Sequence, residues 1–281
     1  MKATKLLPLL AVVLCVPGIA LRALHLLNGF DVSTGLPAAG DKWVWFVIAL
    51  FVVCAVAYAV MAMPLKHRST ASFEQLLGTQ EVGFRMTAVV AGLITAVGGL
   101  FYLYLTITTA EQDAAAWARV LEIVYAALGV LSGGCMIGLA KAQGAQMNEK
   151  SAAMTLVPLF WSCLHLLVNY RMTCTDPKLA SFGFGLVADV MLTLAFYQLA
   201  KLLFGKPNPM LLAFFGALAI TMSVSDIGGY GLAMLMGIQP MWSGKMIARG
   251  VLSAAASVML AAELFRLCRP SAAVRAAETE E

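Results

Sequence analysis

Eight polar side chains that can hold a charged group or exchange a proton lie inside long apolar stretches of this sequence. They are Arg22, His25, Glu122, His165, Asn169, Asp189, Asp226 and Arg249. An ionised side chain within such a stretch costs several kcal/mol unless it is paired or hydrated, and such residues often line solute pathways. The eight residues are therefore the predicted substrate-binding residues.

Helical spacing places several of these residues on common faces. Arg22 and His25 are three residues apart and His165 and Asn169 are four apart, so each pair shares one helix face. Small or polar residues recur at every fourth position around Asp189: Ser181, Gly185, Asp189, Thr193 and Tyr197. Counted by the rise of about 1.5 Å per residue, these faces reach a similar depth in the outer half of the membrane. The sequence predicts a polar cavity that opens away from the cytoplasm.

The elements that must position these residues are helices. Hydrophobic residues make up 61% and charged residues 12% of the 281 positions, roughly half the charged share of a soluble protein. We expect an all-α fold, a polytopic integral membrane helical bundle of about eight transmembrane helices, forming a single transmembrane domain over residues 1–281 in contact with the lipid bilayer. The expected helices are 5–28, 43–64, 84–108, 117–142, 153–171, 180–204, 209–230 and 246–267.

The distribution of Lys and Arg predicts the orientation. Twelve of them fall at the two termini and at or near the connections 64–85, 142–153 and 204–209, and six fall on the opposite side. Because cytoplasmic loops are enriched in Lys and Arg, both termini are predicted to be cytoplasmic in a multi-pass protein of the cell membrane. The net charge of +4 reflects this loop bias, and no nucleic-acid partner is expected.

A parallel repeat of residues 1–142 and 153–267 is an alternative description of the domain. Each half begins with a helix that carries a similar segment, Leu24-His25-Leu26-Leu27-Asn28 in one and Leu164-His165-Leu166-Leu167-Val168-Asn169 in the other. Some transporters are built from such repeats.

Two functions that involve no catalysed reaction fit a polar cavity in a bundle of transmembrane helices. The favoured one is a carrier or permease-like protein for a small polar or charged solute. Arg22 or Arg249 would hold an anionic group, and Asp189 or Asp226 would hold a cationic group or a coupling proton. The alternative is a non-transporting subunit or sensor whose buried charges dock a membrane protein partner.

A membrane enzyme or redox protein is the third interpretation. His25 and His165 lie on two different helices, as axial ligation of haem requires, although no cofactor is otherwise predicted. The HExxH, GxSxG, Walker and CxxC patterns are missing, so no catalytic residue and no metal ligand is assigned, and enzymatic activity stays open.

Each buried charge also has a purely structural interpretation. Arg22 and Arg249 could pair with Asp189, Asp226 or Glu122 only to hold helices together.

Three local expectations follow from the sequence. Gly228 and Gly229 are candidates for interrupting the seventh helix beside Asp226. Glu263 is expected to form a surface pair with Arg266, one turn away. The connection 64–85 carries apolar residues at helical spacing and is expected to lie along the membrane surface.

Overall fold

The computed structural model describes residues 2–31, 36–38, 40–68, 71–109, 116–144, 153–174, 179–237 and 243–269. These ranges are helical and contain no β-strand. In chain order the elements are α1 (Lys2–Val13), α2 (Cys15–Asn28), α3 (Trp43–Ala62), the 3-10 helix η1 (Met63–Arg68), α4 (Phe73–Leu76), α5 (Val82–Thr108), α6 (Ala116–Ala142), α8 (Leu156–Thr173), α9 (Leu179–Leu203), α10 (Pro209–Leu235) and α11 (Gly244–Leu267).

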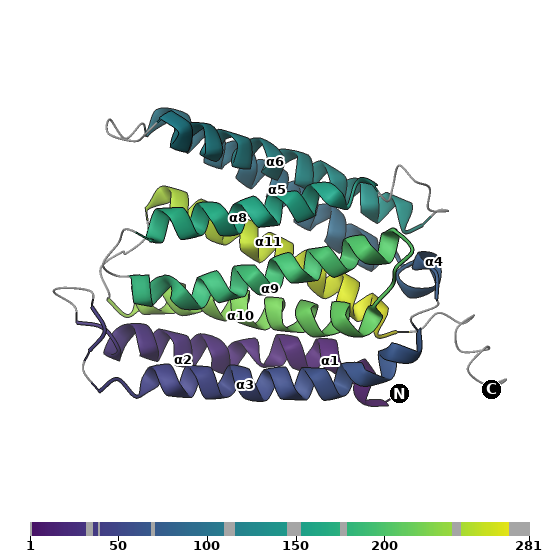
Figure 1. Cartoon of the computed structure of the whole chain (residues 1–281), viewed down its shortest axis with the longest axis horizontal. Helices are drawn as coiled ribbons and strands as arrows, with labels where there is room; N and C mark the ends of the chain where they lie inside the picture. The colour runs from purple at the N-terminus through teal and green to yellow at the C-terminus, as the bar shows by residue number, and fades with distance from the viewer. Residues whose placement is uncertain are drawn as a thin grey trace.

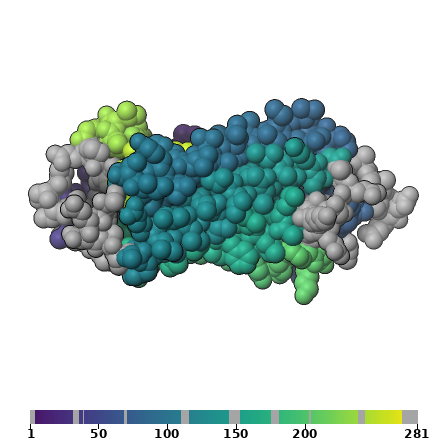
Figure 2. Space-filling view, turned by 90° about the horizontal axis from the view of Figure 1, so that it is seen from above, coloured from purple at the N-terminus to yellow at the C-terminus, as the bar shows by residue number. Residues whose placement is uncertain are grey.

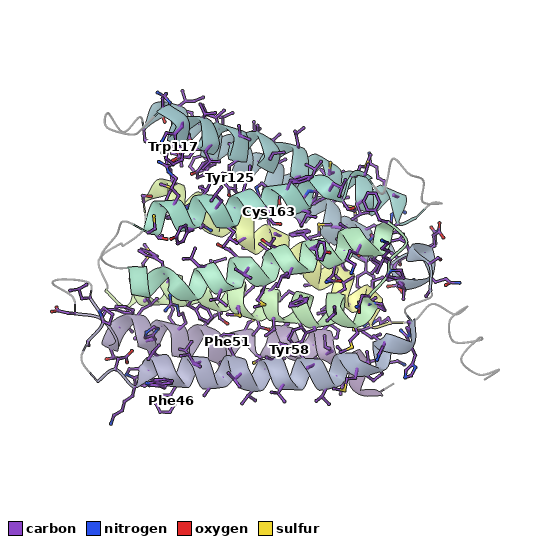
Figure 3. All side chains as sticks on the ribbon, viewed as in Figure 1. Phe46, Phe51, Tyr58, Trp117, Tyr125 and Cys163 are labelled. Carbon is purple, nitrogen blue, oxygen red and sulfur yellow. The ribbon has the colours of Figure 1, made fainter. Side chains whose placement is uncertain are left out.

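The long helices run side by side along one axis, with α10 at the centre of the packing (Figure 1). α10 contacts α1, α2, α3, α9 and α11, whereas α8 packs between α6 and α9, and α5 packs against α6 and α11. Many buried residues of α10 are small, such as Gly216, Ala217 and Ala219, which lets neighbouring backbones approach closely. On α3, Tyr58 lies on the side facing the rest of the bundle (Figure 3), and its hydroxyl is 2.8 Å from Thr221 Oγ1 of α10.

The distribution of polarity is that of a membrane protein. Large apolar side chains cover the outside, including Val53 of α3, Phe101 of α5 and Val120 of α6. The face that Figure 2 displays is formed largely by α5, α6 and α8. Charged side chains such as Arg22 and Arg249 are buried instead. Lipid favours this arrangement because the outer apolar surface needs no water.

Seven helices of the described chain are long and apolar enough to cross a membrane, with α1 and α2 counted as one span. The predicted all-helical, multi-pass architecture is confirmed to that extent. All eight predicted apolar stretches form helices, but α8 is not among the seven, because His165, Asn169 and Arg171 reduce its hydropathy. The exact number of crossings, the identity of the membrane and the internal repeat stay predictions.

The two ends of the bundle differ in what they carry. The start of α1, the short helix α4 and the end of α11 lie at one end (Figure 1), which we call the terminal end. The opposite end, the site end, carries Arg22, Asp226 and Arg249. The terminal end is the one that the Lys and Arg distribution predicts to be cytoplasmic; its side of the membrane stays a prediction.

The first predicted helix is divided at Leu14, between α1 and α2. Pro17 explains the division, because it has no N–H to donate to the carbonyl of Val13, and its ring crowds that carbonyl. The helical bonds resume on either side: Leu14 N donates to Leu10 O and Gly18 N donates to Leu14 O.

The connection after α3 packs against the bundle, and its position along the membrane surface stays a prediction. Leu65, Phe73, Leu76 and Leu77 are buried in the main hydrophobic core. A capping box at Ser72, with Gln75 as the reciprocal partner, starts α4. The predicted surface segment therefore folds against the terminal end of the bundle.

The glycines of α10 do not interrupt the helix, which continues to Leu235. They serve packing against α2 instead. A Cβ atom on Gly228 would lie 2.6 Å from Ile19 Cγ1, and one on Gly229 would lie 2.5 Å from Arg22 Cγ. The predicted break is wrong because close approach to α2 accounts for these residues.

Glycine also sets the spacing of α5 and α6. A Cβ atom on Gly92 would lie 2.7 Å from Gly133 O, and one on Gly133 would lie 2.5 Å from the backbone nitrogen of Ala96. Gly134, next in the sequence, has nothing within 4 Å of such an atom. Substituting each of these two neighbouring glycines therefore distinguishes the effect of helix packing from the effect of helix propensity.

We expect Gly133→Ala to lower the free energy of unfolding by about 1–3 kcal/mol, because the methyl group meets backbone atoms that cannot yield without moving a helix. Gly134→Ala should leave it unchanged or raise it by up to about 1 kcal/mol, since Ala is the better helix former. Unfolding in mixed micelles with increasing SDS measures both. Equal effects of the two changes would contradict the described α5–α6 packing.

Candidate functional site

A cavity of about 80 Å³ lies between α8, α9, α10 and α11 near the site end. It has room for roughly five water molecules, or for a solute of a few non-hydrogen atoms. Five of the predicted binding residues line it: His165, Asn169, Asp189, Asp226 and Arg249. The structure thus brings together residues from four helices that are far apart in the sequence.

The cavity extends from the site end to about the middle of the bundle. Its deepest lining residues include Asp189, ten residues after the start of α9, and Ser253, nine residues after the start of α11. At 1.5 Å per residue this is about 15 Å, or half of a typical hydrocarbon core. The prediction of a common depth for these polar faces agrees with this geometry.

Arg22 lies beside the cavity in a buried ion pair. Its side chain is 0% exposed, and Nε donates to Asp226 Oδ1 at 2.9 Å. Nη2 donates to the backbone carbonyl of Ser181, and Nη1 donates to His25 Nδ1 at 2.8 Å. All three guanidinium nitrogens therefore have protein partners.

Aromatic rings and a glycine complete the surroundings of this ion pair. The Arg22 guanidinium carbon lies 5.1 Å from the ring centroid of Phe184 and 5.3 Å from that of Tyr230, within cation–π range. A Cβ atom on Gly185 would lie 2.6 Å from Asp226 Oδ2. Gly185 therefore leaves the space on α9 that the carboxylate of α10 occupies.

His25 belongs to the same cluster but lies outside the cavity lining. Because Arg22 can only donate, His25 Nδ1 accepts, and the ring proton lies on Nε2. Nε2 faces Asp41 Oδ2 at 3.4 Å. Asp41 also accepts from the backbone nitrogens of Trp43 and Val44 and so fixes the start of α3. The role of His25 is to connect α2 to the beginning of α3.

His165 is the centre of a second cluster on the opposite wall. Its Nδ1 is 2.7 Å from the hydroxyl of Tyr125, and its Nε2 is 2.8 Å from Ser253 Oγ and 3.4 Å from Asp189 Oδ1. Asn169 Nδ2 donates to Asp189 Oδ2 at 2.5 Å. A hydrogen-bonded chain therefore leads from α6 through α8 to the carboxylate on α9.

Tyr125 was not identified from the sequence. It lies on α6, on the side toward α8 (Figure 3), and it is 0% exposed. A tyrosine in the middle of an apolar helix was the available signal, because a buried phenol usually has a hydrogen-bond partner. The sequence could not indicate that the partner is His165, 40 positions away.

Arg249 differs from Arg22 in having unsatisfied donors. Its side chain is buried, at 3% relative exposure, and lines the cavity. Nε and Nη1 have no hydrogen-bond partner within the described ranges. Ser223 Oγ, on the α10 wall of the cavity, is also buried without a partner there. A buried charge in this condition is costly, so the cavity presents a cation that a bound group would stabilise.

Glu122 is engaged elsewhere. Lys245 Nζ donates to its Oε2 at 2.8 Å, and Arg171 Nη1 lies 3.6 Å from its Oε1. Arg171 also stacks on Trp117, with its guanidinium carbon 4.8 Å from the ring. These contacts join α6, α8 and α11 at the site end, outside the cavity lining, and the partners of Glu122 are Lys245 and Arg171, not Arg22 or Arg249.

The geometry gives no support to haem binding. His25 and His165 lie in separate clusters, and each ring nitrogen faces a protein partner. No group of three or more His, Cys, Asp or Glu side chains arranged for a metal ion occurs in the described part of the chain. The expectation that the protein carries no cofactor stays a prediction.

The expected surface pair of Glu263 and Arg266 is wrong. Glu263 is buried, at 3% relative exposure, and accepts from Gln143 Nε2 at 2.5 Å. Arg266 instead donates through Nε and Nη2 to the backbone carbonyl of Gly78. The segment after α4 and the end of α6 cover this part of α11, which sequence spacing alone could not indicate.

Comparison of the chain with protein-family models, with curated protein sequences and with solved structures gave no match. Function is therefore inferred from the geometry of the site.

We expect Asp226→Asn to lower the free energy of unfolding by about 3–5 kcal/mol, because it leaves the buried Arg22 without its counter-ion. Arg22→Gln should cost a similar amount. The double variant should cost clearly less than the sum of the two, since no lone charge is left buried. SDS unfolding in mixed micelles gives all three values, and strictly additive costs would contradict the ion pair.

Proposed function

We propose that this protein is a carrier or permease-like membrane protein that binds a small anionic solute, of the size of acetate or lactate, in the cavity between α8 and α11. The observation that carries this proposal is Arg249, a buried arginine that lines the cavity and has two donor nitrogens without a partner in the described chain. A carboxylate accepts charge-assisted hydrogen bonds from guanidinium nitrogens, and these are stronger than hydrogen bonds between neutral groups.

The pairing of the other charges supports Arg249 as the anion-binding residue. Arg22 and Arg249 were equivalent candidates in the sequence, but Arg22 already has Asp226 and two further acceptors. A solute at Arg22 would have to displace a buried ion pair. At Arg249 it would supply missing partners, so binding there costs less.

Asp189 supports coupling to a proton. In the described chain its only ion-pair partner is His165, and no Lys or Arg lies within ion-pair distance of it. Carboxylate and histidine chains of this kind act as proton relays in membrane transporters. We assign the coupling proton to the Asp189–His165 pair, which lines the same cavity as Arg249.

The alternative of a docking subunit receives less support. Its premise is that buried charges form contacts with a partner, yet Arg22 pairs with Asp226 and Glu122 pairs with Lys245 inside the chain. Among the buried charges of the described ranges, Arg249 has unsatisfied donors, and it lines the cavity.

We expect sodium acetate and sodium lactate to raise the thermal unfolding temperature of the detergent-purified protein, and Arg249→Ala to abolish that rise, because the guanidinium group is the proposed anchor. Arg119→Ala removes an exposed arginine near the same end and should leave the rise intact. Sodium chloride at equal ionic strength controls for general salt effects.

The same variants in proteoliposomes decide whether binding leads to transport. Uptake of radiolabelled acetate, driven by an imposed proton gradient, should be lost in Arg249→Ala and kept in Arg119→Ala. An unfolding shift that survives Arg249→Ala would overturn the proposed site, and binding without uptake would overturn the carrier function.

One contact favours a second candidate, a membrane hydrolase. Ser253 Oγ lies 2.8 Å from His165 Nε2, the separation of a nucleophile and its general base. In a catalytic triad the carboxylate lies at the other ring nitrogen. Here Asp189 lies on the Nε2 side, and the Tyr125 hydroxyl occupies Nδ1. The arrangement is therefore better suited to holding a proton than to activating the serine.

Labelling with a fluorophosphonate, which reacts with activated serines, separates these candidates. We expect no modification of Ser253 in the purified protein, because no carboxylate lies at Nδ1 of His165 to stabilise the protonated ring. Stoichiometric labelling of wild type that disappears in Ser253→Ala would establish the hydrolase and displace the carrier.

A further inference from the structure

An apolar groove runs along the outer surface of the bundle between α8 and α9. Its volume is about 540 Å³. The groove is lined by Cys163, Leu166, Leu167 and Tyr170 from α8 and by Leu186, Val187 and Val190 from α9. Cys163 lies on α8 within this seam (Figure 3) and is exposed. The groove therefore lies on a surface that lipid chains would contact.

The groove and the polar cavity are both lined by α8 and α9. On α8, His165 and Asn169 line the cavity, whereas Leu166 and Tyr170, the next residues in the chain, line the groove. Leu186 of α9 lines both. Leu186 is therefore the residue that contacts both the apolar groove and the cavity lined by Arg249.

The dimensions fit one extended hydrocarbon chain. From Cys163 to Tyr170 the groove follows α8 for about 10 Å at the helical rise. This is most of the distance between the middle and the surface of the hydrocarbon core. Its upper end, at Tyr170, is level with the cavity residues Asn169 and Thr173.

We propose that the small anionic group bound at Arg249 is the carboxylate head of a single-chain amphiphile, a fatty acid in chemical class, which enters sideways from the membrane. This inference rests on the proposed function of Arg249. The head would pass Leu186 and pair with Arg249, while the tail stays in the groove between α8 and α9. The occupant is set by complementarity: the groove is apolar, the cavity behind it holds an unsatisfied cation, and Leu186 joins them.

The test uses a palmitic acid analogue with a photoreactive diazirine in its chain. The probe is added to the protein in phosphatidylcholine nanodiscs, irradiated, and mapped by peptide mass spectrometry. We expect labelling concentrated on α8 residues 163–170 and α9 residues 186–190, competed by palmitate. Arg249→Ala should lower it about tenfold, the effect of losing a charge-assisted hydrogen bond.

Two tryptophan variants test binding in the groove separately from anion binding in the cavity. Val187 lines the groove and not the cavity, so Val187→Trp should block labelling while acetate still raises the unfolding temperature, which also shows that the variant is folded. Val53→Trp places the same bulk on an exposed, lipid-facing position of α3 and should change neither readout.

The outcomes separate this inference from the proposed function. Labelling spread evenly over exposed faces such as α3, and insensitive to Val187→Trp, would overturn the amphiphile while the acetate effect at Arg249 stands. If acetate stabilisation survives Arg249→Ala, the proposed anion site itself fails. Labelling of the groove that survives Arg249→Ala would show an ordinary lipid contact and overturn the connection between groove and cavity.

Discussion

The buried ion pair of Arg22 and Asp226 determines how the site is built. It fixes α2 against α10, and through the Ser181 carbonyl and Phe184 it also fixes the start of α9. A lone arginine at this depth would be costly, and so would a lone aspartate. Once these two neutralise each other, the remaining charges on the cavity wall are those of Arg249 and Asp189, on α11 and α9. Because Arg22 and Asp226 neutralise each other without a ligand, Arg249 and Asp189 are the charges that remain to interact with one.

Small residues leave the space in which the Arg22–Asp226 ion pair forms. The ion pair forms only because Gly229 admits the Arg22 side chain and Gly185 admits the Asp226 carboxylate. In lipid, helix association depends on close packing and on hydrogen bonds between helices, since apolar burial alone gives little advantage. Close packing at glycines thus takes the place of the hydrophobic effect that stabilises a soluble core. The same glycines also allow the Arg22 and Asp226 side chains to come into contact. The same residues that tighten α2 against α10 leave α11 with an unpaired arginine.

The sequence predicts the helices and the polar faces well, because both follow from local spacing. His165 with Asn169 and the series through Asp189 could be placed on common faces by counting, and their shared depth followed from the helical rise.

The choice of partners could not be predicted. Arg22 and Arg249 look alike in the sequence, and only the approach of α2 to α10 gives Asp226 to Arg22. Gly228 and Gly229 resembled a helix break, although they mark that approach. Glu263 resembled an exposed residue because Gln143 and the segment after α4, which cover it, are distant in the chain.

The position of the cavity follows from the way α8 meets its neighbours. α8 packs closely on α6 and α9, while its link to α11 is made by side chains, Ser253 against His165. Polar side chains with several hydrogen-bond partners do not fill space as glycine and alanine contacts do, so this junction is left with a chamber. On the other side of the same helix, the α8–α9 seam closes over that chamber with Leu186. Toward α2 the chamber is bounded by the Arg22–Asp226 pair, whose separation would leave two buried charges unpaired. An entrance past Leu186, as proposed for the amphiphile, would leave that ion pair intact.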